Sequence, residues 1–367
     1  QGQTEQSRQT VAEENDAEQA KTAGNLEVHF IDVGQGDATL IKCDGHSMLI
    51  DAGNNDKGTL VQNYLQHQGV ETLDYVIGTH PDADHIGGMD VVLYKFDCKT
   101  IIMPDVANNT RTYDDVVQTM KNKGYKTTYP VVGETYTIGG AAFTIIAPNK
   151  EYGNDMNSWS VGVLLQNGNH RFLFTGDAEE GAEQDILQNG IDISADVYKV
   201  AHHGSNTATS QAFLDAVHPT YAVISAGEGN SYGHPHAEVL NRLRAAGVSV
   251  FRTDEQGTIV ASSDGTTLTW NMSPSESWQA GEAEKSQNTE KSEKAADSQN
   301  NAETDAAVSN PTDQTDGNSD VIVHITKTGE KYHSAGCQYL RQSDIEVTLS
   351  EAKARGLTPC SKCNPPQ

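Results

Sequence analysis

Residues 79–85 read Thr-His-Pro-Asp-Ala-Asp-His and follow the apolar, strand-like run DYVIG. Four side chains that can bind a metal ion, His80, Asp82, Asp84 and His85, lie within six residues. Because a strand that ends in a turn can direct neighbouring side chains to one point, and because imidazole and carboxylate groups suit zinc or manganese, this segment predicts a metal site at a strand end. The alternative, a polar loop with a capping aspartate, explains one such residue better than four.

Three later segments carry further potential ligands. The run FLFTGD ends at Asp177, VYKVAHHG ends with His202 and His203, and SYGHPH places His234 near the expected start of a helix. Each segment alone is a weak signal, because an aspartate after glycine is commonly a turn residue. Together they predict that histidines and aspartates from several strands meet in one place.

The segments around these residues alternate between strand-like and helix-like patterns. Short β-branched runs closed by Gly or Asp, such as LEVHFIDV, HSMLIDAG and YAVISAG, predict strands. Helices are predicted in KGTLVQNYLQHQG, YDDVVQTMKNKG, AEQDILQNG and HAEVLNRLRAAG, and the last two show apolar residues three or four apart and end at glycine. Many short strands with helices between the later ones favour two packed sheets covered by helices.

Composition divides the chain into four parts. Residues 1–24 hold no aromatic side chain, and residues 273–320 hold 11 acids, three lysines and one aromatic, Trp278. Such segments bury too little apolar area to offset the entropy of ordering, so we expect a disordered N-terminal tail and a disordered acidic linker. Residues 25–272 then form the main domain, and residues 321–367 form a small C-terminal module.

The charge balance limits the possible partners. The chain carries 25 Lys and Arg against 51 Asp and Glu, a net charge of −26. Residues 25–272 hold 14 of these bases and 31 of the acids, a net −17, whereas residues 321–367 hold six and four, a net +2. We therefore expect no tight nucleic-acid binding by charge alone. No apolar run approaches ~18 residues, so no membrane span is expected.

The order of the motifs resembles the metallo-β-lactamase superfamily, and within it the ComEC-like branch of extracellular competence hydrolases. The stretches that carry the resemblance span residues 28–236 and read VHFIDVGQGDATLI, MLIDAG, THPDADHIGGM, FLFTGD, VYKVAHHGSNTATS and YGHPH. The resemblance implies an α/β fold, an αββα sandwich, with two divalent metal ions, zinc or manganese, along one edge.

The resemblance also implies the metal ligands, which are His80, Asp82, Asp84, His85, Asp177 and His203. The first two would serve one metal and the next two the other, with Asp177 between both metals. His203 is preferred to His202 because it precedes Gly204, as the family ligand precedes a glycine. His202 would then lie beside the site and contact the substrate.

Two departures from the superfamily bear on the metal. Asp82 stands where the commonest motif has histidine, and the segment before FLFTGD offers Asn157 in place of a histidine. Harder oxygen ligands make manganese a more plausible occupant.

For Asp37 in the glycine-rich stretch VGQGDA, the sequence favours a structural role as the cap of a tight turn.

Two neighbouring cations lower the pKa of a bridging water and bind an oxyanion, which favours phosphodiester hydrolysis. Asp84 would orient that water, and His234, with Tyr232, would donate a proton to the leaving group or hold the phosphate. Ser205 and Ser210 would offer hydroxyl groups to phosphate oxygens. The expected catalytic residues are Asp84, His202 and His234, and the expected substrate-binding residues are Asn157, Ser205, Ser210 and Tyr232.

The C-terminal module carries the pattern H-x3-C-x22-C-x2-C, formed by His333, Cys337, Cys360 and Cys363. This is the ligand spacing of a structural zinc, and so small a unit needs a bound metal because its hydrophobic core is small. The alternative is a disulfide among the three cysteines. The module resembles the Ada-like metal-binding domain appended to some exported bacterial nucleases. Cys43 and Cys98 are expected to be buried thiols, or alternatively a disulfide.

Three functions are compatible with this sequence. The first is a metal-dependent phosphodiesterase, most plausibly an exported deoxyribonuclease of DNA uptake. The second is a phosphorylcholine or teichoic-acid esterase, which the acidic charge favours. The third is a non-enzymatic surface-binding protein, against which the full ligand set argues. A start inside a polar tail without methionine predicts an exported or lipid-anchored protein at the cell surface, although an expression fragment would begin in the same way.

Overall fold

A computed structural model of the chain describes residues 23–281, 322–326, 331–333, 345–354, 357–360 and 362–363. The chain divides into two compact units, residues 1–288 and 289–367, which are described separately. Most of the expected tail and linker lies outside the described residues. Within the described residues, no helix combines the length and the apolar character that a bilayer crossing requires.

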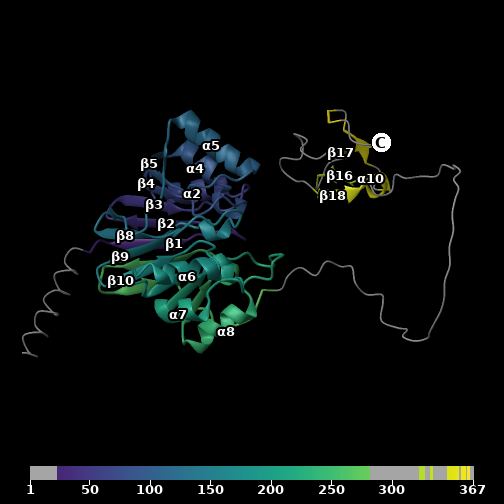
Figure 1. The fold of residues 1–367 in the computed structure, drawn as a ribbon. Coiled ribbons are helices and arrows are strands. Elements are labelled where there is room, and N and C mark those ends of the chain that lie inside the picture. Colours follow the sequence, from purple (N-terminus) through teal and green to yellow (C-terminus); the bar gives the residue numbers. More distant parts are fainter. Residues whose placement is uncertain are drawn as a thin grey trace, which may run out of the picture. The chain divides into compact units, whose positions relative to one another are not determined.

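The larger unit contains two β-sheets (Figure 1). The first has the strand order β15-β14-β1-β2-β3-β4-β5-β6. The bounds in that order are Leu268–Trp270, Ile259–Ser263, Leu26–Phe30, Thr39–Cys43, His46–Ile50, Thr72–Ile77, Asp97–Ile102 and Thr127–Thr128. Strands β3 to β6 run parallel, and the other pairs are antiparallel.

The second sheet has the order β13-β12-β11-β10-β9-β8-β7. The bounds in that order are Ser249–Arg252, Tyr221–Ile224, Val197–Lys199, His170–Phe174, Gly162–Asn167, Ala141–Ala147 and Thr135–Ile138. Strands β10 to β13 run parallel. The central strands of both sheets are buried on both faces, which is why they read as continuous apolar runs rather than as alternating patterns.

Helices cover the outer face of each sheet, so that the unit has four layers (Figure 1). Helices α2 (Gly58–His67), α4 (Met89–Lys95) and α5 (Arg111–Lys123) pack on the first sheet. Helices α6 (Glu180–Gln188), α7 (Gln211–Val217) and α8 (Ala237–Ala245) pack on the second. This arrangement confirms the predicted αββα sandwich. The sequence patterns predicted α2, α5, α6 and α8 but not α4 or α7.

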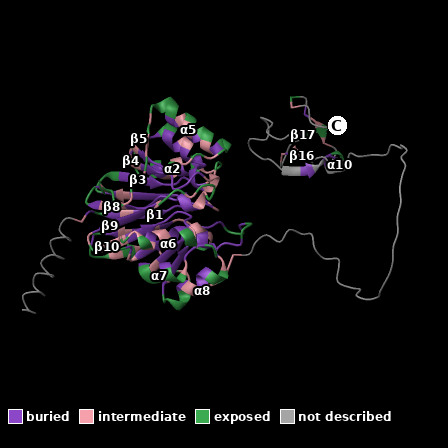
Figure 2. Cartoon of the chain, in the orientation of Figure 1, coloured by how far each residue is buried: buried purple, intermediate pink, exposed green. Residues whose placement is uncertain are grey.

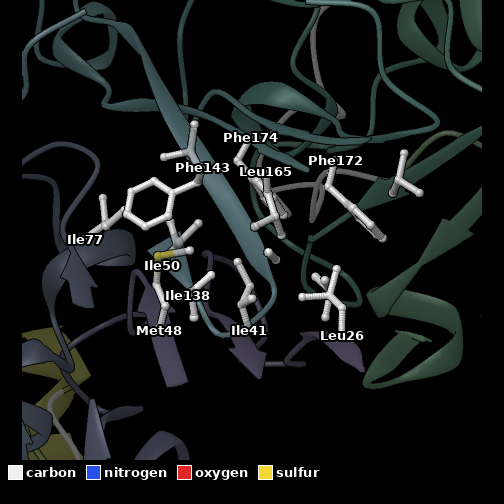
Figure 3. Close-up of a cluster of buried hydrophobic side chains, with 14 of the residues drawn as sticks. Leu26, Ile41, Met48, Ile50, Ile77, Ile138, Phe143, Leu165, Phe172 and Phe174 are labelled. Carbon is white, nitrogen blue, oxygen red and sulfur yellow. The ribbon is translucent and has the colours of Figure 1, made fainter. Parts of the chain in front are cut away.

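The main core lies between the two sheets (Figure 3), where Ile41 and Met48 of the first sheet face Phe143 and Phe172 of the second. Two smaller clusters lie under the helices, and buried residues concentrate in the sheets while the outer helix faces are exposed (Figure 2). Cys43 and Cys98 are buried free thiols on β2 and β5. The described cysteines of this unit therefore match the first of the two expectations.

Residues 273–281, which the sequence places in the linker, pack against the larger unit. Trp278 joins the cluster under α8, and its ring lies 5.7 Å from the Arg244 guanidinium. The backbone N–H of Gly281 donates to the Pro235 carbonyl at 2.9 Å. The ordered unit therefore extends at least to Gly281, because one tryptophan supplies the apolar contact that the composition of this stretch otherwise lacks.

Candidate metal centre

The segment 79–85 lies where strand β4 ends at the edge of the sandwich. His80 follows the strand, and helix α3 (Ala83–Ile86) begins directly after Asp82. The short helix carries Asp84 and His85, and its backbone is held by the Asp82 carbonyl, which accepts from the N–H groups of His85 and Ile86. The turn predicted from the sequence therefore directs these side chains toward one edge.

The same edge receives residues from the second sheet. Asp177 follows strand β10, and His202 and His203 lie in the 3₁₀ turn η2 (Ala201–Gly204) that follows strand β11. Because these strands run parallel to each other, their carboxyl ends meet at one edge. The sandwich thus assembles one cluster from segments separated by about a hundred residues in the sequence.

Asp177 lies at the centre of the cluster. One Asp177 oxygen is 3.1 Å from His85 Nε2 and 3.3 Å from His203 Nε2, and the latter nitrogen is also 3.3 Å from Asp84 Oδ2. Two overlapping sets have all their ligand atoms within 4.8 Å of one another, namely His80, His85 and Asp177, and Asp84, His85 and His203. Asp82 reaches the same region, with an oxygen 3.8 Å from His80 Nε2.

Several buried nitrogen and oxygen atoms of the cluster have no hydrogen-bond partner in the protein. The buried atoms His80 Nε2, His85 Nε2, His203 Nε2 and Asp177 Oδ1 have no hydrogen bond of normal geometry. A buried polar atom without a partner costs free energy, and native structures seldom leave several of them together. Imidazole nitrogens and carboxylate oxygens that converge in this way fit divalent metal ions such as zinc or manganese.

The electrostatics of the cluster also favour cations. Burial opposes protonation of His85, but Asp177 and Asp51 outweigh burial and raise its pKa well above the ordinary value. Burial raises the pKa of Asp177, but His203 and His85 outweigh that effect and hold the pKa well below its usual range. Asp177 is therefore held as a carboxylate, and positive charge beside it is stabilised.

Asp51, which follows strand β3, orients His85 from behind. Its Oδ2 lies 2.8 Å from His85 Nδ1, and Thr79 fixes the carboxylate through its backbone N–H at 2.8 Å and its hydroxyl at 2.7 Å. This contact directs His85 Nε2 toward the cluster, as carboxylates behind metal-binding histidines commonly do. The sequence analysis assigned Asp51 no role, and the only signal was its place in the quoted motif MLIDAG.

Asp37 is another residue whose role the sequence misjudged. The sequence favours a turn cap, but the buried carboxylate lies 3.4 Å from His203 Nδ1 and 3.9 Å from His85 Nδ1. It also forms a salt bridge with the buried ammonium group of Lys199 on β11. Burial raises the pKa of Asp37, but Lys199 and His203 outweigh that effect and lower it. Asp37 therefore belongs to the support of the cluster.

His202 and His203 differ in their surroundings. His203 is buried, and its Nδ1 lies 3.0 Å from the Ser225 carbonyl oxygen, so that its Nε2 faces the cluster. The His202 side chain is 21% exposed, and its Nδ1 lies 3.4 Å from Glu179 while its Nε2 lies 3.7 Å from Asp177. His202 belongs to none of the described groups whose ligand atoms lie within 4.8 Å.

A pocket of about 160 Å³ opens onto the cluster. Its lining consists of Gln35, Asp82, Asp84, Asn157, Asp177, His202, His203, Tyr232 and His234. Asn157 lies in the turn η1 (Asn157–Trp159) and donates its amide to Glu179 at 3.2 Å. The pocket thus contains two of the four predicted substrate-binding residues, Asn157 and Tyr232, together with His202 and His234.

Ser205 and Ser210 are not among the residues that line this pocket. Ser205 is buried and lies 3.0 Å from the Thr207 hydroxyl. Ser210 caps helix α7, where its hydroxyl accepts from the Phe213 N–H at 3.3 Å. The hydroxyl of Ser210 therefore serves the start of the helix, the position that serine commonly occupies, rather than the substrate.

His234 is buried at the pocket wall among other histidine rings. Its ring centroid lies 5.6 Å from that of His202 and 6.1 Å from that of His203. Burial, and then the neighbouring histidines, lower the pKa of His234 to about 3. Its imidazole is therefore neutral near pH 7, so it can form hydrogen bonds but carries no acidic imidazolium proton.

The C-terminal unit contains a second group of possible ligands. Its sheet has the order β18-β16-β17-β19, with bounds Ile345–Thr348, Ile322–Ile325, Lys331–His333 and Thr358–Pro359, and helix α10 (Leu349–Ala354) contacts β16 and β18. The ligand atoms of His333, Cys360 and Cys363 lie within 4.8 Å of one another. Cys337, the fourth expected ligand, lies outside the described residues.

Comparison with known proteins agrees with this geometry. Residues 31–228 match the family model of the metallo-beta-lactamase superfamily. The chain is 31% identical over 255 residues to ComE operon protein 3 of Bacillus subtilis, and this match covers 64% of the chain and 32% of the relative. It is 33% identical to Recombination protein 2 of Haemophilus influenzae, and this match covers 64% of the chain and 28% of the relative.

A third relative is Competence protein ComA of Neisseria gonorrhoeae, which is 29% identical, with 62% of the chain and 31% of the relative covered. The chain thus spans about a third of the length of these curated relatives. The matched regions contain the cluster around Asp177 and the strands that position it. The chain belongs to the metallo-beta-lactamase superfamily, and its similarity to competence proteins supports a ComEC-like branch of that superfamily.

Proposed function

We propose that the larger unit is a dinuclear metal-dependent phosphodiesterase and that its substrate is DNA. The observation that carries this proposal is the set of buried, unsatisfied nitrogen and oxygen atoms around Asp177 at the floor of a polar pocket. DNA is favoured because one relative is named a competence protein, and competence is the uptake of DNA by a cell. The same relationship supports an exported protein that acts at the cell surface.

In this proposal His80 and Asp82 would hold one metal ion and Asp84 and His85 the other, and Asp177 and His203 would complete the ligand set. When bound, two divalent ions lower the pKa of a water molecule and polarise a phosphoryl oxygen. The protein contributes the positions of the ligands: Asp51 directs His85, and the Ser225 carbonyl directs His203, beside which Asp37 lies. The identity of the metal, zinc or manganese, belongs to the same proposal.

The remaining pocket residues act on the substrate. Asp84 would accept a hydrogen bond from a water molecule at the metal centre and would orient it. His234 is neutral, so it holds a phosphate oxygen through a ring N–H rather than donating a proton to the leaving group. His202, oriented by Glu179 at the open side of the pocket, is then the histidine placed to protonate the leaving oxygen.

The test is to load the full chain with manganese or zinc and to offer single-stranded DNA, double-stranded DNA and bis-p-nitrophenyl phosphate. We expect all three to be hydrolysed. Metal analysis should find two ions in the larger unit and one structural zinc in the C-terminal unit, bound by His333, Cys360, Cys363 and Cys337. DNA that stays intact with every metal, while the small diester is cleaved, would contradict the nuclease proposal.

A phosphorylcholine or teichoic-acid esterase is the second candidate function. The observation that favours it is the net charge of −17 on residues 25–272, which repels a polyanion more than it repels a small or zwitterionic ester. Hydrolysis of p-nitrophenylphosphorylcholine without any cutting of DNA would support this candidate.

A further inference from the structure

The rim of the pocket carries an exposed aromatic ring. The Tyr232 side chain is 62% exposed and lines the pocket. The other exposed large apolar side chains among the described residues do not line it; they are Leu60, Tyr94, Tyr129 and Val131. A tyrosine left in water beside a polar pocket gains nothing for folding, because its apolar area is not buried. Its exposed face at the pocket rim is open to a ligand.

The ring is the outermost of three that lead toward the metal cluster. The Tyr232 ring stacks on His234, with centroids 5.5 Å apart and planes inclined by 18°. His234 in turn stacks on His203, with centroids 6.1 Å apart and planes inclined by 27°. The Tyr232 ring is thus held nearly parallel to the inner rings, and the part of it that His234 does not cover is open to the solvent.

The loop that carries Tyr232 is fixed before any ligand binds. The buried Asn230 accepts from the backbone N–H groups of Tyr232 and His234 at 3.2 and 3.0 Å, and it donates to the carbonyls of Gly227 and His234. The Tyr232 carbonyl is 3.2 Å from His236 Nε2. Because the loop is already ordered, a flat ligand on the ring pays little for immobilising it.

We propose that Tyr232 is a stacking platform for a nucleobase of the substrate, adjacent to the phosphodiester held at the metal cluster. This inference rests on the proposed function. Proteins that bind single-stranded nucleic acid commonly stack successive bases on aromatic side chains, and the interaction tolerates every base because each has a flat face. Such a contact attracts DNA to an acidic protein without a basic groove.

A quaternary ammonium group, as in phosphorylcholine, is the alternative ligand for an aromatic ring. Its recognition relies on a cage of several aromatic rings around the cation. Among the described residues that line the pocket, Tyr232 is the only phenol, indole or phenyl ring. A single open face suits a base better than it suits an enclosed cation.

The experiment compares two single-stranded oligonucleotides of equal length and charge, one with a tract of thymidines and the other with a tract of abasic tetrahydrofuran sites. The manganese-loaded full chain should cut the thymidine tract with a KM that is roughly five- to a hundredfold lower than its KM for the abasic tract. Tyr232→Ala should raise the KM for thymidines toward that for the abasic tract and leave kcat within about threefold. Tyr232→Phe should behave like the wild type, because the ring is retained.

Tyr94→Ala is the matched control, since Tyr94 is 63% exposed on helix α4 and does not line the pocket. A second readout does not depend on catalysis: 2-aminopurine in a phosphorothioate oligonucleotide should lose fluorescence on binding the wild type and Tyr232→Phe, but not Tyr232→Ala. Metal content should be equal in all variants.

The outcomes separate the two proposals. If both tracts are cut equally well by the wild type and by Tyr232→Ala, the platform is wrong while the nuclease stands. If neither tract is cut with manganese or zinc, the proposed function fails and the platform fails with it. If Tyr232→Ala impairs only the hydrolysis of p-nitrophenylphosphorylcholine, the ring binds a cation and this inference is overturned.

Discussion

At the scale of single residues, the metal cluster is a set of charges that stabilise one another. Asp177, Asp84 and Asp37 surround two buried imidazoles, and each carboxylate meets at least one of these rings within 4 Å. Removing one member therefore does more than delete a contact, because it leaves the remaining buried charges without compensation.

The first prediction contrasts Asp177 with His202. Asp177→Asn should reduce the metal content of the larger unit from two ions to one at most, because the proposed assignment makes this carboxylate a ligand of both ions. His202→Ala should retain both ions and lose activity. Inductively coupled plasma analysis of the two variants checks this. Should His202→Ala lose metal while His203→Ala keeps it, the roles of the two histidines must be exchanged.

The second prediction concerns the buried pair of Lys199 and Asp37. Lys199→Met in the metal-free protein should lower the free energy of unfolding by about 3–5 kcal/mol, because it leaves Asp37 buried without its main cation. The double variant Lys199→Met/Asp37→Asn should lose less free energy of unfolding than the sum of the losses in the two single variants. Urea unfolding followed by circular dichroism measures both.

The control for this pair is Lys42→Met. Lys42 lies 3.2 Å from Glu27, and both side chains are partly exposed, at 27% and 45%. Such a surface pair contributes about 0–1 kcal/mol. Equal losses for Lys42→Met and Lys199→Met would show that burial does not set the strength of these pairs.

At the scale of elements, the site depends on loops that press against one another. Gly36 has φ +135°, and a Cβ atom there would lie 2.4 Å from the Asp84 carbonyl oxygen. The neighbouring Asp37 N–H donates to the same oxygen at 3.0 Å. The loop after strand β1 therefore supports the helix that carries Asp84 and His85, and a glycine permits the close approach.

The third prediction tests this support. Gly36→Ala should push helix α3 away from the loop, weaken metal binding roughly tenfold or more, and destabilise the unit by about 1–3 kcal/mol. Gly45→Ala is the matched control, because Gly45 also has a positive φ, +84°, but its Cβ would meet no atom within 4 Å. Competition with a metal indicator measures the affinity. Equal affinities in the two variants would contradict the supporting role.

The sequence predicted the elements better than the contacts between them. The alternation of strand and helix patterns predicted two packed sheets, and the strand-end motifs predicted that their histidines and aspartates meet. The family resemblance then implied the sandwich and the ligands His80, His85, Asp177 and His203. The pair of Lys199 and Asp37 is separated by 162 positions, and no local pattern connects them. The role of Ser210 is a local signal that is easily missed, because the helix after it has only seven residues and is too short for a clear helical period.

At the scale of the whole molecule, charge determines how the substrate approaches. Residues 25–272 carry a net −17 and residues 321–367 a net +2. The repulsion between the acidic domain and DNA extends about 10 Å at 0.1 M salt and farther at lower salt. Proteins that bind DNA through many phosphate contacts lose affinity steeply as salt rises. The affinity of this chain for DNA should not fall steeply as salt rises.

The last prediction uses this difference. Between about 20 and 150 mM salt, the kcat/KM for long duplex DNA should rise or stay constant, because screening weakens the repulsion more than it weakens the few attractive contacts. Deleting residues 321–367 should lower the rate on long duplex DNA several-fold and change the rate on bis-p-nitrophenyl phosphate less than twofold, since only a long substrate can contact both units. A steep fall of activity with salt in the full chain would instead indicate phosphate contacts that the charge distribution does not predict. An equal loss on both substrates would mean that the C-terminal unit acts on the metal centre rather than on DNA.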